Sequence, residues 1–184
     1  MINVFDKSDY SIRKSPIQNI KILFRHLKYA RQRIRCGFSD MDVWDVDDYL
    51  NDVIPGMLEK LLKDIDVLGG FPGSMVEAYY KEHKDEIGCE WGEFLCQATD
   101  NAKAWNERME KECSEKWKSI IKKMIFLFHE QNYDTCSVKN TFSWEDDSER
   151  EEWRKREAEI DQYRSVCRAK AFAMLAEWYD CLWT

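Results

Sequence analysis

The chain has 184 residues and a formal net charge of −7, with 44% hydrophobic and 34% charged residues. This balance fits a globular domain with a core of its own and excludes a disordered or membrane-embedded chain. No apolar run approaches the ~20 residues that span a bilayer, and residues 1–10 lack the apolar stretch of a signal peptide. Seven cysteines without a CxxC pair are typical of reduced thiols in a cytosol.

The charge is unevenly distributed along the chain. Residues 1–36 contain nine Lys or Arg and two Asp, a balance of +7, so the remainder carries −14. Such a division indicates either two binding surfaces or two elements that neutralise each other inside one fold. We favour the second interpretation.

The first predicted helix begins at Ser15 and Pro16, a serine N-cap followed by proline at the first helical position. Gly37 is suited to end it. One face of this helix is apolar, with Ile20, Leu23, Phe24, Leu27, Ala30 and Ile34 at helical spacing. A different face is basic and consists of Lys21, Arg25, Lys28 and Arg35.

The second predicted helix begins at Ser39, where Asp42 completes a capping box. Its apolar positions run from Leu50 to Ile65, and Pro55 predicts a kink or a break near Ile54. The segment 69–73, of sequence GGFPG, predicts the clearest turn in the chain.

The rest of the sequence is also helical in pattern. We predict a short helix from Ser74 to Gly88, a long periodic stretch over 91–128 that residues 99–101 divide, a loop at 132–148, and a last helix starting at Ser148. The predicted fold is therefore an all-α bundle of five or six helices, with residues 1–184 forming one domain and residues 1–14 extended or flexible.

The aspartates after Gly37 are predicted to serve two purposes. Asp45, Asp48 and Asp52 share one helical face, roughly opposite the apolar stripe, and should point to water. Asp47 falls on the apolar side, and a buried carboxylate needs a partner. We therefore expect Asp47 to pair with Arg33 or Arg35 across the turn at Gly37.

A family resemblance lies in the same segment, whose residues are Arg33, Arg35, Gly37, Phe38, Ser39, Asp40, Asp42, Trp44 and Asp47. The pattern R-x-R-x-G-F-S-D-x-D-x-W-x-x-D resembles a signature of small helical proteins from bacteriophages and prophages. In that group a turn of the form HGYP often follows; here it is Gly69-Gly70-Phe71-Pro72, without the histidine. The resemblance implies a viral origin and a helical fold, but no chemistry.

Two carboxylate sets raise the alternative of a metal site. Asp45, Asp48 and Asp52 lie on one helix, and three such groups seldom enclose an ion without ligands from a second helix, so a solvated acidic face is favoured. The second set resembles the ExxE pairs of all-α nucleotide pyrophosphohydrolases, which bind Mg²⁺, and comprises Glu90, Glu93, Glu107 and Glu110. Ordinary spacing of glutamates on exposed helices explains it as well.

Two further surfaces are candidates for binding. Lys21, Arg25 and Lys28 can contact phosphates, although no recognition-helix pattern or interleaved aromatics accompany them. Trp144 stands in a predicted loop beside Glu145, Asp146 and Asp147 and has the character of an interaction hot spot.

The sequence contains no P-loop, GxSxG, HExxH or GxGxxG motif, and we assign no catalytic residue, metal or cofactor. The leading hypothesis is a phage-encoded, non-enzymatic protein in the cytoplasm of the infected host. It would present acidic helical surfaces to the basic nucleic-acid-binding groove of a host protein, as an anti-CRISPR or other anti-defence inhibitor does. The alternatives are the Mg²⁺-dependent nucleotide hydrolase and a virion or DNA-packaging component whose basic helix contacts DNA.

Overall fold

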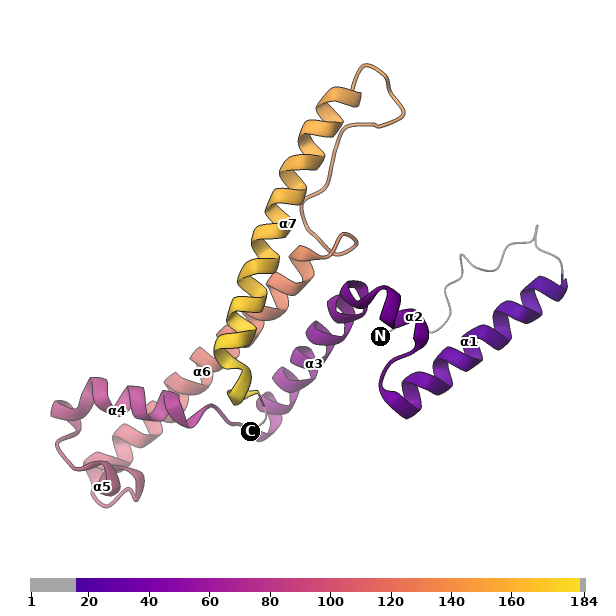
Figure 1. Ribbon diagram of the computed structural model, residues 1–184. Helices are drawn as coiled ribbons and strands as arrows, with labels where there is room; N and C mark the ends of the chain where they lie inside the picture. The colour runs from indigo at the N-terminus through magenta and orange to yellow at the C-terminus, as the bar shows by residue number, and fades with distance from the viewer. Residues whose placement is uncertain (1–15, 183–184) are drawn as a thin grey trace. The chain divides into compact units, whose positions relative to one another are not determined.

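The computed structural model describes residues 16–182, so the predicted extended segment 1–14 lies outside the described residues. The described residues form seven α-helices and a closing 3₁₀ turn, Tyr179–Cys181 (Figure 1). The helices are α1 (Pro16–Cys36), α2 (Asp40–Trp44), α3 (Val46–Leu68), α4 (Gly73–Ile87), α5 (Trp91–Leu95), α6 (Asp100–Gln131) and α7 (Arg150–Trp178). The prediction of an all-α fold with a long loop before the last helix is confirmed.

The residues divide into two compact units, of which the first ends at Gly56 and the second begins at Met57. We describe each unit by itself and call them unit 1 and unit 2. The division shows which residues pack together. The prediction that residues 1–184 fold as one domain stays a prediction.

Most helix boundaries lie where the local sequence signals predict them. Gly37 follows α1 with a φ of +84°, and Gly88 follows α4 with a φ of +67°, both in the left-handed region that glycine enters without strain. Thr99 caps α6, its hydroxyl accepting a hydrogen bond from the Ala102 amide at 3.1 Å. The predicted division of the long periodic stretch near residues 99–101 is therefore confirmed.

One of the two alternatives predicted at Pro55 is wrong. Helix α3 continues through Pro55 without a break near Ile54, and the alternative of a kink stays a prediction. An interruption lies at Asp45, between α2 and α3, where φ is −119° and ψ is 55°. A proline inside a helix removes one backbone hydrogen bond, and the remaining bonds of a 23-residue helix continue on both sides of it.

Unit 2 is organised around α6. Helix α7 packs against it in the antiparallel direction, and α4 and α5 pack against α6 as well (Figure 1). The long side chains that this packing buries almost completely include Phe94, Trp117, Ile121, Met124 and Phe128. A substantial apolar core therefore holds unit 2 together.

Unit 1 differs, because the apolar face predicted on its first helix stays exposed. Ile20, Leu23, Phe24, Leu27 and Ile34 of α1 are all exposed, Ile34 to 88%. The small unit offers this face little to pack against, since α1 contacts mainly the five-residue helix α2. Among residues 16–182, no helix is both long and apolar enough to cross a bilayer.

Candidate partner-binding surface

A buried ion pair forms the corner between α1 and α2. The Arg33 guanidinium makes a two-pronged contact with the Asp42 carboxylate, with Nε donating to Oδ2 at 2.9 Å and Nη2 donating to Oδ1. The same carboxylate accepts hydrogen bonds from the Ser39 amide at 2.7 Å and the Ser39 hydroxyl at 2.9 Å. The bond from Arg33, with help from Ser39, outweighs burial and lowers the pKa of Asp42 to about 2. Asp42 is thus the carboxylate that fixes the corner.

This geometry corrects the predicted pairing of Asp47. The partner of Arg33 is Asp42, whereas Asp47 and Arg35 are both exposed. Asp47 lies one turn before Leu50, the first half-buried apolar side chain that follows it on α3, so its carboxylate stays in water and needs no buried partner. The expectation that Asp47 faces inward is therefore wrong, because the packed part of α3 begins later than the apolar pattern does.

Three further contacts support the corner. Lys28 Nζ lies 2.7 Å from Asp40 Oδ2, and Gln32 Oε1 accepts a bond from the Asp40 amide at 3.1 Å. The Tyr49 hydroxyl donates to the Gly37 carbonyl at 2.5 Å. The bond from Lys28 lowers the pKa of the exposed Asp40. Lys28, predicted to contact phosphate, is therefore engaged within the chain, while Lys21 and Arg25 are exposed on α1.

The three carboxylates that are predicted to point to water are exposed. Asp45, Asp48 and Asp52 are exposed, and Asp47 joins them. Trp44, directly before Asp45, is 86% exposed. We call these five residues the acidic face. Asp48 and Asp52 share one side of α3, Asp45 lies at the break before the helix, and Asp47 lies on a neighbouring side.

The Trp144 loop is more ordered than its sequence predicts. The Trp144 ring packs edge-on against Trp153 of α7 at 5.0 Å between centroids. The guanidinium groups of Arg150 and Arg154 lie over it at 5.3 and 5.4 Å. Trp144 is still 48% exposed, so it anchors the loop and presents an edge to solvent.

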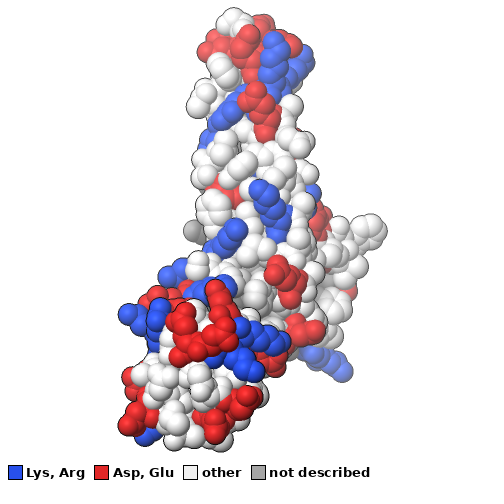
Figure 2. Space-filling view, turned by 90° about the vertical axis from the view of Figure 1, so that its left-hand side faces the viewer, with Lys and Arg blue, Asp and Glu red and all other residues white. Residues whose placement is uncertain are grey.

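The carboxylates around Trp144 are largely occupied in holding the loop. Asp146 accepts bonds from the Ser148 amide at 2.8 Å and the Ser148 hydroxyl at 2.7 Å, which lower its pKa. Asp147 pairs with Arg150, and Glu145 is exposed. At this end of α7, basic and acidic side chains lie side by side (Figure 2). The acidic face of unit 1 is consequently the more uniform of the two predicted surfaces.

A buried carboxylate that the sequence pattern did not single out attaches the start of the loop. Glu130, at the end of α6, is 3% exposed. It accepts bonds from the Ser137 hydroxyl and the Tyr163 hydroxyl, both at 2.8 Å, and from the Ser137 amide. Burial raises the pKa of Glu130, but these bonds outweigh burial and the net direction is downward. A glutamate at the end of a helix carries no sequence signal that distinguishes it from a solvated one.

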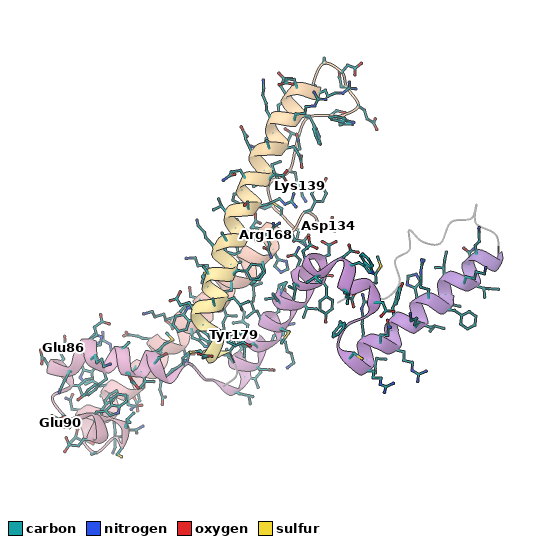
Figure 3. All side chains as sticks on the ribbon, viewed as in Figure 1. Glu86, Glu90, Asp134, Lys139, Arg168 and Tyr179 are labelled. Carbon is teal, nitrogen blue, oxygen red and sulfur yellow. The ribbon has the colours of Figure 1, made fainter. Side chains whose placement is uncertain are left out.

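Beside this attachment the loop folds back on itself. Lys139 Nζ donates to the carbonyl oxygens of Tyr133 and Asp134 at 3.1 and 3.2 Å, and Figure 3 shows Lys139 and Asp134 close together there. Further along, the Asn140 side-chain amide donates to the Trp153 carbonyl at 2.9 Å. The loop therefore runs along the first turns of α7 in a fixed path.

The four glutamates of the hydrolase alternative are not gathered into one site. Glu90, labelled in Figure 3, and Glu93 form the capping box of α5, with Glu93 accepting from the Glu90 amide at 3.2 Å. Glu107 and Glu110 are exposed on α6. Over residues 16–182, no group of three or more His, Cys, Asp or Glu side chains is placed to hold a metal ion.

Comparison of the chain with models of protein families, with curated proteins and with solved structures finds no match in any of the three. The resemblance to phage proteins therefore rests on the segment from Arg33 to Asp47 and enters the functional argument as a proposal.

Proposed function

We propose that this chain is a phage-encoded binding protein that inhibits a host protein by occupying its basic nucleic-acid-binding groove with the acidic face. The exposed carboxylates of Asp45, Asp47, Asp48 and Asp52 carry the proposal. The protein works in the cytoplasm of the infected bacterium, and its target belongs to host defence, as for an anti-CRISPR inhibitor.

Charge density supports a nucleic-acid mimic. Asp45, Asp48 and Asp52 place three carboxylates over about 10 Å, close to the charge of one DNA strand, which carries one phosphate per ~3.4 Å of helix axis. A groove lined with Lys and Arg attracts such a row at long range and accelerates encounter. No basic side chain interrupts the sequence from residue 36 to residue 59.

Trp44 can supply binding affinity that exposed carboxylates alone do not give. Exposed carboxylates give orientation and encounter rate, whereas buried aromatic side chains at the centre of an interface give most of the affinity. Trp44 lies next to the carboxylates and is 86% exposed, ready to be buried by a partner. Its loss of water contact on binding would add a specific anchor to a surface that is otherwise only acidic.

The corner contacts keep this surface in one orientation relative to α1. The ion pair between Arg33 and Asp42 and the bond from Tyr49 to Gly37 fix α2 and the first turn of α3 before any partner arrives. A surface that is ordered in advance loses less conformational entropy on binding.

Affinity capture tests the proposal. The immobilised chain is exposed to lysate of a bacterial host, and bound proteins are eluted with a DNA or RNA oligonucleotide. We expect a nucleic-acid-binding protein to be released, because the oligonucleotide and the acidic face compete for one groove. The Asp45→Asn, Asp48→Asn, Asp52→Asn triple variant should bind at least about tenfold more weakly, with the steepest loss at low salt.

A charge-matched control separates the acidic face from net charge. The Glu107→Gln, Glu110→Gln, Glu115→Gln triple variant removes the same three charges from exposed positions of α6. It should capture the partner as the unchanged chain does. Equal capture by both triple variants would refute the mimic. If the partner stays bound at saturating oligonucleotide, the chain does not occupy the partner's nucleic-acid-binding groove.

A further inference from the structure

Unit 2 contains a cavity of about 540 Å³ between α4, α6 and the C-terminal end of α7. Trp178, which lines it, directly precedes Tyr179, labelled in Figure 3. Cavities that bind small organic molecules commonly have volumes of about 300 to 1,000 Å³. The cavity shares no residue with the acidic face, and ligand binding there does not depend on the proposed function.

The inner surface of the cavity is apolar and aromatic. Met75, Tyr79 and Cys113 are buried there, and burial raises the pKa of the Cys113 thiol, which therefore stays neutral. Trp178 forms part of the wall and is held by Trp117, at 5.3 Å between ring centroids. Such a lining accepts the flat or apolar body of a ligand.

Tyr79 adds a polar group without a partner. Its side chain is 93% buried, at 7% exposure, and its hydroxyl makes no hydrogen bond within the described part of the chain. The ring is fixed by His83 at 4.5 Å, which in turn packs on Trp105 at 5.2 Å. A buried hydroxyl that lacks a partner is costly. The Tyr79 oxygen is closed to water, so a ligand oxygen would bond to it once the ring turns toward the cavity that Tyr79 lines.

The rim of the cavity is mainly negative. Glu82, Glu112 and Glu177 stand against Lys116, and all four are exposed. Arg108 engages Glu112 at 2.8 Å, whereas Glu82 and Glu177 make no hydrogen bond or ion pair with any residue in 16–182. The two unengaged carboxylates favour a positively charged group at the mouth.

We propose that this cavity binds a small organic cation: an amine with a flat or apolar body and an oxygen that bonds to the Tyr79 hydroxyl. The body lies against Tyr79 and Trp178, and the ammonium group lies at the rim, near Glu82 and Glu177. The arrangement selects against anions of the same shape, because the rim repels them.

Three probe molecules separate the parts of this proposal. Tyramine has the cation, the ring and the oxygen; phenethylamine lacks the oxygen; 4-hydroxyphenylacetate keeps the ring and oxygen but carries a negative charge. In amide NMR titrations we expect tyramine to bind with a Kd between about 0.1 and 10 mM, typical of a ligand this small. The shifted amides should centre on Ala78 and Cys113, and 4-hydroxyphenylacetate should shift none of them.

Two variants test the assigned residues. Tyr79→Phe keeps the ring and should weaken tyramine about three- to tenfold, the effect of one hydrogen bond, while leaving phenethylamine unchanged. The Glu82→Gln, Glu177→Gln variant should weaken both amines about two- to fivefold in a salt-dependent manner. Glu107→Gln, an exposed change away from the cavity, serves as the matched control.

The outcomes are decisive in either direction. If 4-hydroxyphenylacetate binds as tightly as tyramine, the rim does not select a cation. If Tyr79→Phe weakens both amines equally, the Tyr79 hydroxyl does not bond to the ligand oxygen. Failure of both amines to shift Ala78 and Cys113 at 10 mM would overturn the site as a whole.

Discussion

The two units hold their helices together by different physical means. In unit 2, α6 and α7 bury large apolar side chains, Trp117 and Phe128 among them, almost completely. In unit 1 the apolar face of α1 stays exposed, and a hydrogen-bonded ion pair joins α1 to α2. Burial of apolar area is non-directional and large, whereas a charged network is directional and depends on every member. We therefore predict that the stability of unit 1 depends more on pH than that of unit 2. It should depend less on the replacement of large apolar side chains by alanine.

The largest expected effect comes from the core of unit 2. Trp117 is 1% exposed and packs on Trp178, so Trp117→Ala should lower the free energy of unfolding by about 3 to 5 kcal/mol. Urea denaturation followed by circular dichroism measures the loss. Trp44→Ala is the matched control in unit 1, since Trp44 is 86% exposed and should change stability by no more than about 0.5 kcal/mol. Equal losses would remove the contrast between the units.

The corner of unit 1 should respond next. Asp42→Asn removes the charge that Arg33 engages and leaves a partly buried guanidinium without its counterion. We expect a local loss of about 2 kcal/mol, seen as faster amide hydrogen exchange at Ser39 and through α2. Asp40→Asn, which affects only an exposed pair with Lys28, should leave these exchange rates unchanged. Unchanged exchange in Asp42→Asn would show that the ion pair does not hold the corner.

The sequence predicts the ends of helices better than it predicts which carboxylates are buried. Local signals located the helix ends well, because Gly37, Gly88 and Thr99 act through their own backbone and near neighbours. Helical spacing also assigned the outward face of Asp48 and Asp52. Helical spacing does not show how far a neighbouring helix covers a face. The extent of that cover decides whether a carboxylate on the face is buried.

Because spacing along one helix does not show burial, the sequence assigned the wrong partner to Arg33 and did not single out two buried polar groups. Asp47 lies on the apolar side of α3 but before the packed part, whereas Asp42 is enclosed by the turn. Glu130 and Tyr79 became notable only through partners distant in sequence, or through the lack of one. Periodicity along one helix contains no information about either.

Acid should act on unit 1 through Asp42. Its pKa is lowered from 3.8 to about 2 in the folded chain, so the stabilisation is complete above pH 4 and is lost as pH falls toward 2. The shift corresponds to about 2 kcal/mol. Carboxyl NMR of Asp42 should show a midpoint near pH 2, with the Ser39 amide moving in parallel. In the Arg33→Met variant the midpoint should rise, because Arg33 is the largest cause of the shift; an unchanged midpoint would contradict that assignment.

The smallest expected effect concerns the attachment of the loop in unit 2. Tyr163→Phe removes the hydroxyl that donates to Glu130 at 2.8 Å but keeps the ring, so the stability should fall by about 1 kcal/mol. The change should be local, as faster hydrogen exchange at the Ser137 amide, which bonds to the same carboxylate. Tyr133→Phe is the matched control, because Tyr133 is exposed and contributes its ring, rather than its hydroxyl, to the contact with Arg164.

The same variant also tests how unit 2 keeps a buried charge. The Tyr163 bond is one of those that together outweigh burial and lower the pKa of Glu130, so its removal should raise that pKa toward the ordinary value. The loop should then detach at a higher pH than in the unchanged chain, since a group with a lowered pKa stabilises the fold only above it. If acid acts on Tyr163→Phe and on the unchanged chain at the same pH, the bonds from Ser137 and Cys136 hold the carboxylate without Tyr163. The charged network of unit 2 is then as local as the corner of unit 1.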